Sequence, residues 1–319
     1  MFALSSALSA GNLWPMKLPF HTLDVFTTRK FVGNPLAVIL GADQLTTEQM
    51  QTITREFNLP EITFVLKPEN PANTAKVRIF VPSKEMPFAG HPTIGTAILL
   101  AELQMFDEVM LELKAGLTPV KITRADKLVT ATLTAPIVPF AINVPLPSLS
   151  NTAMALGLET KDIGFDDHKL AVLEGGPKFL LVPVNSREAL AKIRITEPNW
   201  SNMLTAMNAS PAGAGIMRAV YIYTRGGDAP KTSFRARMFA PGNGIPEDPA
   251  TGAATVLLAS QLLRAEKLKD GTHNWQLEQG YEMGRPSDLR LECDVAGGAL
   301  KAVRLGGHAV KVMSGEIEL

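Results

Sequence analysis

Two stretches of the sequence follow the same pattern. The first reads Arg78-Ile-Phe-Val-Pro82 and resumes as Phe88-Ala-Gly-His-Pro-Thr-Ile-Gly-Thr-Ala97. The second reads Arg237-Met-Phe-Ala-Pro241 and resumes as Pro246-Glu-Asp-Pro-Ala-Thr-Gly-Ala-Ala254. In each, a short Arg-x-Phe strand leads through a loop rich in Pro and Gly into a predicted helix. Internal similarity at this separation indicates a duplicated domain.

The two predicted helix starts share their chemistry. His91-Pro92 aligns with Asp248-Pro249, and a glycine follows in both copies. Proline suits the first helical position because its missing N–H would have no partner there. Asp is also a favoured N-cap, so we expect Asp248 to cap its helix and His91 to occupy the equivalent place. The segments that follow are small and apolar, which predicts two helices buried on nearly all sides.

Two buried helices in duplicated domains could direct their N-termini into one cleft. Their free N–H groups and positive dipole ends would then hold a carboxylate or a phosphate. The local pattern alone is equally compatible with two ordinary capped core helices, so both interpretations stay open at this point.

The composition narrows the class of protein. The chain has 319 residues, 46% apolar and 19% charged, which fits two domains of a globular enzyme. Lys plus Arg and Asp plus Glu number 31 each, so a nucleic-acid partner is disfavoured. The single cysteine, Cys293, excludes an internal disulfide and has the sequence context of a core residue. No apolar run is long enough for a membrane span, and we expect a cytoplasmic protein without metal or cofactor.

The order of elements predicts an α+β fold with two similar domains, each a curved, mostly antiparallel sheet wrapped around a central helix. Residues 1–16 are interpreted as an N-terminal extension, because they lack the basic start of a signal peptide. Residues 136–147 contain several prolines and are interpreted as the crossing between domains. Three short strands are expected at 300–305, 309–313 and 316–319, the last two returning to the first sheet. The predicted domains are therefore 17–135 with 303–319, and 136–302.

Several motifs in register give the sequence a family resemblance. It resembles the PhzF-like phenazine-biosynthesis family from about Lys17 to Leu319. The resemblance implies a diaminopimelate-epimerase-like fold with the active site between two domains. It also implies cofactor-free proton transfer on a small carboxylated molecule, and a homodimer. The motifs that carry it are Phe31-Val-Gly-Asn-Pro-Leu-Ala-Val38, Asn58-Leu-Pro-Glu-Ile-Thr-Phe64, Pro87-Phe-Ala-Gly-His-Pro-Thr-Ile-Gly-Thr96, Glu247-Asp-Pro-Ala-Thr-Gly-Ala253 and Gln279-Gly-Tyr-Glu-Met-Gly-Arg-Pro-Ser287.

Glu61 is the first candidate for catalysis. Its neighbours Leu59, Pro60 and Ile62 are apolar, and a carboxyl group among them should have a raised pKa. Such a group can accept a proton from carbon and deliver it near neutral pH. The resemblance implies that this glutamate is the general acid/base, whereas the sequence alone would favour a solvated Glu at a strand start.

His91 and Asp248 are the other catalytic candidates. His91 suits proton shuttling or hydrogen bonding to a substrate, and Asp248 could orient a substrate ammonium or complete a relay with His91. Helix capping is the structural alternative for both. Related epimerases have two opposed cysteines at these places, so the two-thiol mechanism is not available here.

The predicted substrate-binding residues surround the helix starts. Gly90, Gly95 and Gly252 would allow close approach of the backbone, so that their amides hold the substrate carboxylate. Asn34 is interpreted as either a cleft residue or a turn residue. Ala253 stands where family members acting on the anthranilate-type substrate often have Ser, which puts that substrate in doubt.

The leading hypothesis is a cofactor-independent isomerase that moves a proton between carbons of a small amino or hydroxy acid. A two-base racemase or epimerase that uses Glu61 with Asp248 or His91 is the second hypothesis. A catalytically silent small-molecule binding protein is the third.

Overall fold

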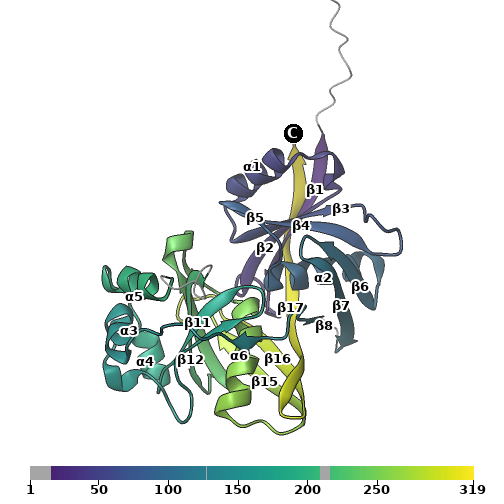
Figure 1. Ribbon diagram of the computed structural model, residues 1–319. Coiled ribbons are helices and arrows are strands. Elements are labelled where there is room, and N and C mark those ends of the chain that lie inside the picture. The colour runs from purple at the N-terminus through teal and green to yellow at the C-terminus, as the bar shows by residue number, and fades with distance from the viewer. Residues whose placement is uncertain (1–15, 127, 209–215) are drawn as a thin grey trace, which may run out of the picture.

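The computed structural model describes residues 16–126, 128–208 and 216–319. The predictions for residues 1–15 lie outside this part of the chain. Two lobes lie side by side in Figure 1, joined by one long strand that runs through both. Among the described residues, no helix is both long and apolar enough to cross a membrane.

The first lobe is a ring of strands. Neighbouring strands pair as β1–β2–β3–β4–β6–β7–β8–β17, and β17 pairs with β1, so the ring is closed. The β2–β3 and β4–β6 pairs are parallel and the rest are antiparallel. Its strands are β1 Lys17–Val25, β2 Asn34–Leu40, β3 Glu61–Leu66, β4 Ala75–Val81, β6 Glu108–Leu113, β7 Gly116–Ala125, β8 Leu128–Thr134 and the C-terminal part of β17 Ala299–Glu318.

The second lobe repeats this order. Its strands pair as β10–β11–β12–β13–β15–β16–β17, again with the second and fourth pairs parallel. A short strand, β9, adds to the β10 edge. These strands are β9 Phe140–Ala141, β10 Ala171–Glu174, β11 Lys178–Pro183, β12 Ile216–Arg225, β13 Phe234–Ala240, β15 Gly271–Gln279 and β16 Ser287–Ala296. The matching order confirms the predicted α+β fold with two pseudo-symmetric halves.

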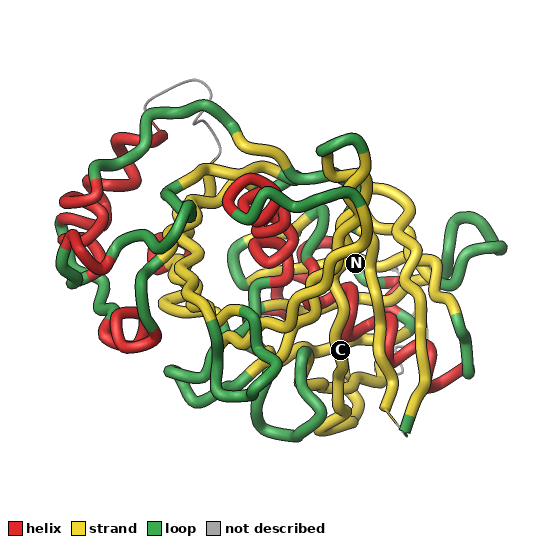
Figure 2. The backbone as a smooth tube through the Cα atoms, turned by 90° about the horizontal axis from the view of Figure 1, so that it is seen from below, coloured by secondary structure: helices red, strands yellow, loops and turns green. Residues whose placement is uncertain are grey.

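Each lobe encloses one helix, α2 Gly90–Gln104 or α6 Gly252–Ala265. Residues 90–101 of α2 and most of α6 are buried, as the sequence predicted. In Figure 2 these helices lie among the strands, and another group of helices lies on the outer side. Helix α1 Thr47–Phe57 begins with a capping box formed by Thr46 and Gln49. The described residues also form α3 Leu149–Leu156, α4 Arg187–Lys192 and α5 Asn199–Asn208, with 3-10 turns at Ala42–Gln44, Thr160–Asp162 and Pro241–Asn243.

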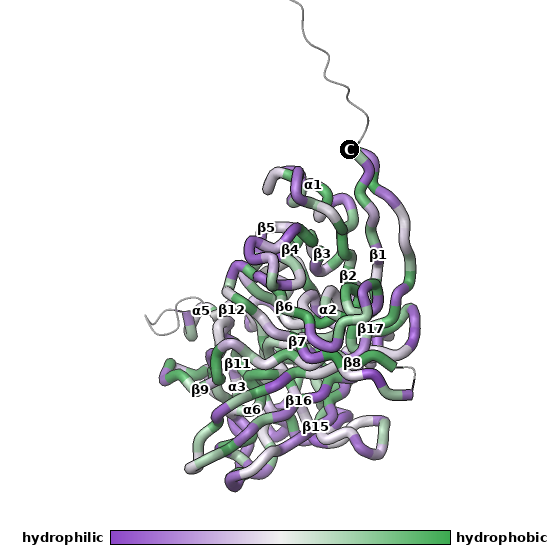
Figure 3. Tube along the Cα trace, turned by 90° about the vertical axis from the view of Figure 1, so that its right-hand side faces the viewer, coloured by the Kyte–Doolittle hydropathy of each residue, from purple (hydrophilic) through white to green (hydrophobic). Residues whose placement is uncertain are grey.

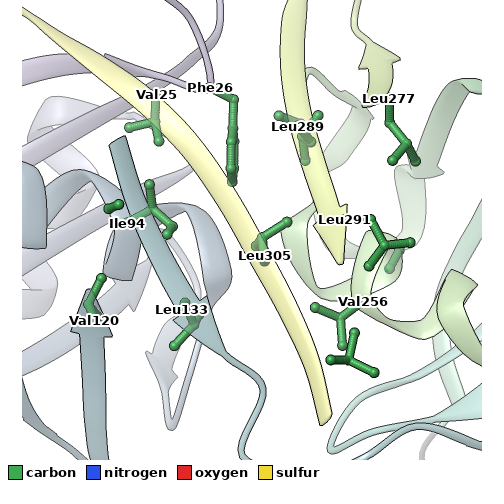
Figure 4. Close-up of a cluster of buried hydrophobic side chains, with 14 of the residues drawn as sticks. Val25, Phe26, Ile94, Val120, Leu133, Val256, Leu277, Leu289, Leu291 and Leu305 are labelled. Carbon is green, nitrogen blue, oxygen red and sulfur yellow. The ribbon is translucent and has the colours of Figure 1, made fainter. Parts of the chain in front are cut away.

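The long strand β17 corrects one prediction. Three separate strands were expected beyond residue 299, but the chain stays extended from Ala299 to Glu318. Leu305 lies on β17 between side chains of the two lobes, with Ile94 and Leu133 on one side and Leu291 on the other in Figure 4. Figure 3 shows hydrophobic and hydrophilic stretches alternating along the strands, as half-buried strands require. The shared strand therefore gives both lobes one continuous core.

The repeated Arg-x-Phe segments are β4 and β13. Each one turns back into a short strand before its helix, β5 Lys84–Met86 or β14 Ile245–Asp248, where the sequence predicted only a loop. These hairpins bring the chain to the N-termini of α2 and α6.

Candidate active site

The N-termini of α2 and α6 meet at two glycines. A Cβ atom on Gly252 would lie 2.5 Å from Leu305 Cδ2 and 3.5 Å from Gly90 Cα. A Cβ on Gly90 would lie 3.3 Å from Gly252 Cα. The first-turn amides of a helix have no partner inside the helix and lie at its positive end. The predicted convergence of two helix tips is therefore present, and it places a pair of cationic dipole ends side by side.

Glu61 begins β3 beside these tips, in contact with His91. Its Oε2 atom lies 3.3 Å from His91 Nδ1. The His91 Nε2 atom lies 3.3 Å from the carbonyl oxygen of Pro35, which can only accept a hydrogen bond. The proton of a neutral imidazole is therefore on Nε2, which leaves Nδ1 as an acceptor facing the carboxyl group. Because Glu61 Oε2 is buried without another partner, a hydrogen bond here requires a proton on the carboxyl group.

Burial shifts the pKa values of this pair in the directions that the geometry requires. Burial, followed by the negative charge of Asp248, raises the pKa of Glu61 to about 8. Burial lowers the pKa of His91 to about 3, so its imidazole is neutral at pH 7. The Glu61 side chain as a whole is 17% exposed, although its Oε2 atom is buried. A carboxyl group that titrates near neutral pH is suited to both accepting and returning a proton.

Asp248 comes from the second lobe and ends β14. Its Oδ1 accepts a hydrogen bond of 2.8 Å from Asn34 Nδ2, and its Oδ2 accepts one of 2.5 Å from the Thr251 hydroxyl. The Asn34 amide also donates to the carbonyl of Ala250 at 2.9 Å. Burial raises the pKa of Asp248, an effect that the two side-chain hydrogen bonds oppose. The carboxyl group is thus fixed in place by both lobes.

The helix-capping predictions need correction. Helix α6 starts at Gly252 with Thr251 as N-cap, so Asp248 lies outside the helix. His91 is already the second residue of α2, whose N-cap is Ala89. The prolines also differ, because Pro92 is inside α2 whereas Pro249 precedes α6. The aligned pair His91 and Asp248 thus has no capping role that would account for it.

Comparisons with known proteins show the family of this chain. The family model described as "Phenazine biosynthesis-like protein" matches residues 23–315. The chain belongs to the phenazine biosynthesis-like family. A relative from Mesorhizobium japonicum named as an uncharacterized isomerase is 40% identical over 92% of this chain and 96% of its own length. The trans-2,3-dihydro-3-hydroxyanthranilate isomerase of Pseudomonas aeruginosa is 33% identical over 94% of this chain and 99% of its own.

A solved structure has the same fold. The phenazine biosynthesis protein of the PhzF family from Bacillus anthracis has a TM-score of 0.83, at 24% identity, over 95% of this chain and 99% of that one. This likeness shows the fold. The named relatives identify the chain as an isomerase of the phenazine biosynthesis-like family.

Of the predicted substrate-binding residues, Gly95 lies away from the helix tips and Ala253 lies at them. Gly95 lies in the second turn of α2, where a Cβ atom would lie 2.5 Å from Leu36 and 2.7 Å from Val25. It therefore serves packing and lies beyond the free amides of the tip. Ala253 follows Gly252, is half-buried and lines an apolar recess together with Gly90 and Gly252.

Thr251 and Gln279, which both bond to Asp248, were not singled out by the sequence analysis. Gln279 Nε2 donates to the carbonyl of Asp248 at 2.8 Å and to the Thr251 hydroxyl at 2.9 Å. Gln279 Oε1 accepts a hydrogen bond of 3.1 Å from the Thr251 amide. Gln279 opens the last of the quoted motifs, and its position before a glycine was the available signal.

Cys293 is buried, as predicted, and burial raises the pKa of its thiol to about 11.

Across the described ranges, no three His, Cys, Asp or Glu side chains are grouped as metal ligands would be. The geometry leaves Glu61, His91 and Asp248 as the candidate catalytic residues, with Asn34, Thr251 and Gln279 in contact with Asp248.

Proposed function

We propose that this chain moves a proton between two carbons of a small carboxylated amino or hydroxy acid, with Glu61 as the general acid/base and without a cofactor. The observation that carries the proposal is the buried Glu61 carboxyl group, which faces the unprotonated Nδ1 of His91 beside two joined helix tips. The raised pKa of Glu61 lets one group act as base and then as acid.

The proposed reaction uses three parts of the site. The amides at Gly90 and Gly252 bind the substrate carboxylate, because they are unpaired donors at positive helix ends. The ionised Glu61 then takes a proton from one carbon, and the electron pair of that C–H bond moves into the adjacent unsaturated system. A different carbon on the same face accepts the proton back from Glu61, which regenerates the carboxylate.

His91 and Asp248 support the proton on Glu61. The Nδ1 atom of His91 accepts a hydrogen bond from the protonated Glu61, which stabilises the intermediate state of the enzyme. The buried charge of Asp248 disfavours a second negative charge at Glu61 and so keeps its proton affinity high. Asp248 also offers an acceptor to an amino or hydroxyl group of the substrate.

Trans-2,3-dihydro-3-hydroxyanthranilate is the first substrate to test, because a relative of 33% identity is named as its isomerase. The apolar Ala253 removes a hydroxyl donor from the recess at the helix tips. We therefore expect a panel of small unsaturated amino and hydroxy acids to contain better substrates than this compound.

The decisive variant is Glu61→Gln. It retains the shape of the side chain but cannot carry the transferred proton, so turnover and solvent-deuterium incorporation should fall by ~10²–10⁴-fold. The matched control is Glu85→Gln, which removes a carboxyl group of the same lobe that pairs with Arg78 outside the site. Full turnover in Glu61→Gln would contradict the proposed role.

A two-base racemase or epimerase remains the second candidate, because the pKa of Asp248 is raised as well. Inversion at one carbon needs acids on opposite faces, whereas a shift between carbons needs only one. Chiral analysis of the product therefore separates the two reactions.

We also propose that the active protein is a cytoplasmic homodimer, as the family resemblance implies. The proposed domains, 17–135 with 303–319 and 136–302, place Glu61 and His91 in one domain and Asp248 in the other. Light scattering of the purified protein tests the dimer.

A further inference from the structure

Two loops from different lobes are joined beside the active site. The loop 26–33 connects β1 to β2, and the loop 280–286 connects β15 to β16. The Gly33 amide donates to the carbonyl of Pro286 at 3.0 Å, and the Asp288 amide donates to the carbonyl of Phe26 at 2.7 Å. We call these two loops the clasp, because they bond one lobe to the other directly.

The side chain of Arg285 makes the clasp's charged contacts. Its Nε donates to the carbonyl of Gly33 at 2.7 Å, and one terminal nitrogen donates to the carbonyl of Val32 at 3.1 Å. The same nitrogen is 2.6 Å from Asp24 Oδ1, and Asp24 Oδ2 accepts from the Phe31 amide at 2.6 Å. The Asp24 side chain is 6% exposed, so this ion pair is shielded from water. Charge-assisted bonds of this kind are stronger than neutral ones.

The first loop leads directly into the active site. Asn34, which follows Gly33, donates its side-chain amide to Asp248. Pro35 is the next residue, and its carbonyl accepts from His91 Nε2. Any displacement of residues 32 and 33 would therefore move both the partner of Asp248 and the partner of His91.

The second loop starts from the other side of the same site. Gln279, which bonds Asp248 and Thr251, precedes Gly280. The Arg285 amide donates to the carbonyl of Gly280 at 2.9 Å, which closes the loop on itself. Arg285 is thus linked to Asp248 by two paths. One runs through Gly33 and Asn34, and the other runs through Gly280 and Gln279.

Close packing leaves these loops little freedom. Gly280 has φ +77, and a Cβ there would lie 2.5 Å from the Arg285 carbonyl oxygen and 2.6 Å from that of Pro249. Gly33 has φ +75, and its Cβ would lie 2.5 Å from the carbonyl oxygen of Val25. Both positions need glycine, because the backbone is left-handed and backbone oxygens block a side chain.

We propose that Arg285 is a positioning residue for the acid/base centre. Its guanidinium group holds residues 32–35 against the second lobe, which keeps the Asn34 amide on Asp248 and the Pro35 carbonyl on His91. The Pro35 contact selects the Nε2–H tautomer of His91, so Arg285 acts on Glu61 through the segment 33–35 and His91. The expected loss of turnover rests on the proposed function, whereas the expected tautomer of His91 does not.

The test uses Arg285→Lys, which keeps the charge but lacks the planar fork of donors. The chain offers a closely matched control in Arg124→Lys. Arg124 also bonds one carboxylate, of Asp107, and two backbone carbonyls, of Ala101 and Phe106. The two arginine side chains have nearly equal exposure, 28% for Arg124 and 29% for Arg285. Only Arg285 borders the active site.

The first readout is the ¹⁵N NMR spectrum of the imidazoles, with the His91 signals assigned by their loss in His91→Asn. Wild type and Arg124→Lys should show His91 with its proton on Nε2. Arg285→Lys should show a shift towards a mixture of both tautomers. An unchanged His91 spectrum in a folded Arg285→Lys protein would overturn the proposal.

The second readout is turnover of trans-2,3-dihydro-3-hydroxyanthranilate. Misplacement of an acid/base centre by about 1 Å costs on the order of 10²-fold in rate, so kcat should fall by ~10²-fold in Arg285→Lys while KM changes little. Wild-type kcat in Arg285→Lys would overturn the proposal. If the wild type turns over neither this compound nor any member of the panel of small unsaturated amino and hydroxy acids, the result counts against the proposed function and leaves the NMR test in force.

Asp24→Asn provides the second variant if Arg285→Lys does not fold. It keeps the acceptor for the Phe31 amide but removes the charge that orients Arg285. The same shift of the His91 tautomer is expected, and its absence in a folded Asp24→Asn protein would overturn the proposal.

Discussion

The two hairpins that lead to α2 and α6 are nearly identical in construction. Arg78 bonds Glu85 through two nitrogens at 2.8 and 2.9 Å, and Arg237 bonds Glu247 at the same distances. In both, the guanidinium carbon lies over the Phe two residues further along, at 5.1 Å in the first and 4.7 Å in the second. The duplication thus preserves the parts that aim a helix tip at the centre of the molecule.

The tips themselves differ in chemistry. The first tip has the neutral His91 beside Glu61, and the second has the carboxyl group of Asp248. In β12, the counterpart of β3, Val220 pairs with Phe239 as Ile62 pairs with Phe80, so Ala219 stands in the place of Glu61. The pseudo-symmetric scaffold provides the convergence of the tips, and under the proposed function only the first lobe carries the acid/base residue.

The largest expected difference between the hairpins is in stability. Arg237 is 6% exposed and also donates to the carbonyl of Leu190 at 3.0 Å, whereas Arg78 is 20% exposed. Arg237→Met leaves both Glu247 and the Leu190 carbonyl without their buried partner and should lower the free energy of unfolding by about 3 kcal/mol. Arg78→Met should cost only ~1 kcal/mol, because Arg78 is more exposed and Glu85 keeps its ion pair with Lys114 at 3.4 Å. Urea unfolding of the two variants measures the difference, and equal losses would show that the hairpins are supported alike.

Much of this comparison was accessible from the sequence, because the repeat lies in local patterns. Gly90 and Gly252 follow Pro-containing turns in aligned segments, and small apolar residues after them predict buried helices. The duplication made convergence of the tips one of two open interpretations. The sequence alone favoured a solvated Glu61, although its neighbours are apolar. The family resemblance, carried by five short motifs, then assigned the chemistry.

The remainder depends on contacts between distant residues. Asp248 reads as an N-cap in its local context, but Asn34, more than 200 residues earlier, binds its carboxylate and places it before the helix. The bend expected within residues 306–308 is absent, because pairing with β8 keeps β17 extended there. Arg285 has no local pattern that indicates its partners in the other lobe, and the glycine after Gln279 does not indicate the bonds of Gln279 to Asp248 and Thr251.

The second largest expected effect is a difference in how protein stability depends on pH. It distinguishes the proposed catalytic carboxyl group of Glu61 from the structural one of Glu85. The folded-state pKa of Glu61 is raised, so its favourable contribution is present below about pH 4.5 and is lost as the pH rises to about 8. Glu61→Gln avoids this loss and should become more stable than wild type at pH 8.5, by more than ~1 kcal/mol.

Glu85→Gln should show the opposite sign. The hydrogen bond from Arg78 lowers the pKa of Glu85, so its contribution is present above the ordinary pKa and is lost as the pH falls. Wild type should therefore be the more stable protein at pH 7, and the gap should narrow towards pH 3. Unfolding curves at several pH values test both variants, and parallel pH profiles would mean that the two carboxyl groups have similar environments.

The smallest expected effect is a change in the pKa of Glu61, at the first tip, caused by a substitution of Asp248 at the second tip. Asp248→Asn removes a negative charge that, after burial, is the main cause of the raised pKa of Glu61. The pKa of Glu61 should therefore fall, by about one unit, which is typical for the loss of one nearby charge. The limb of the pH–rate profile that reports Glu61 would move to lower pH, because the base form is populated earlier. Asparagine has one acceptor oxygen, so it can keep the hydrogen bond from the Thr251 hydroxyl but then loses the one from Asn34 Nδ2. The Thr251 amide still has its own bond to Gln279 Oε1, which holds the start of α6. Carbon-13 NMR titration of the Glu61 carboxyl group gives the same pKa without a substrate. An unchanged value would mean that the two tips, although joined through Gly90 and Gly252, act on the transferred proton independently.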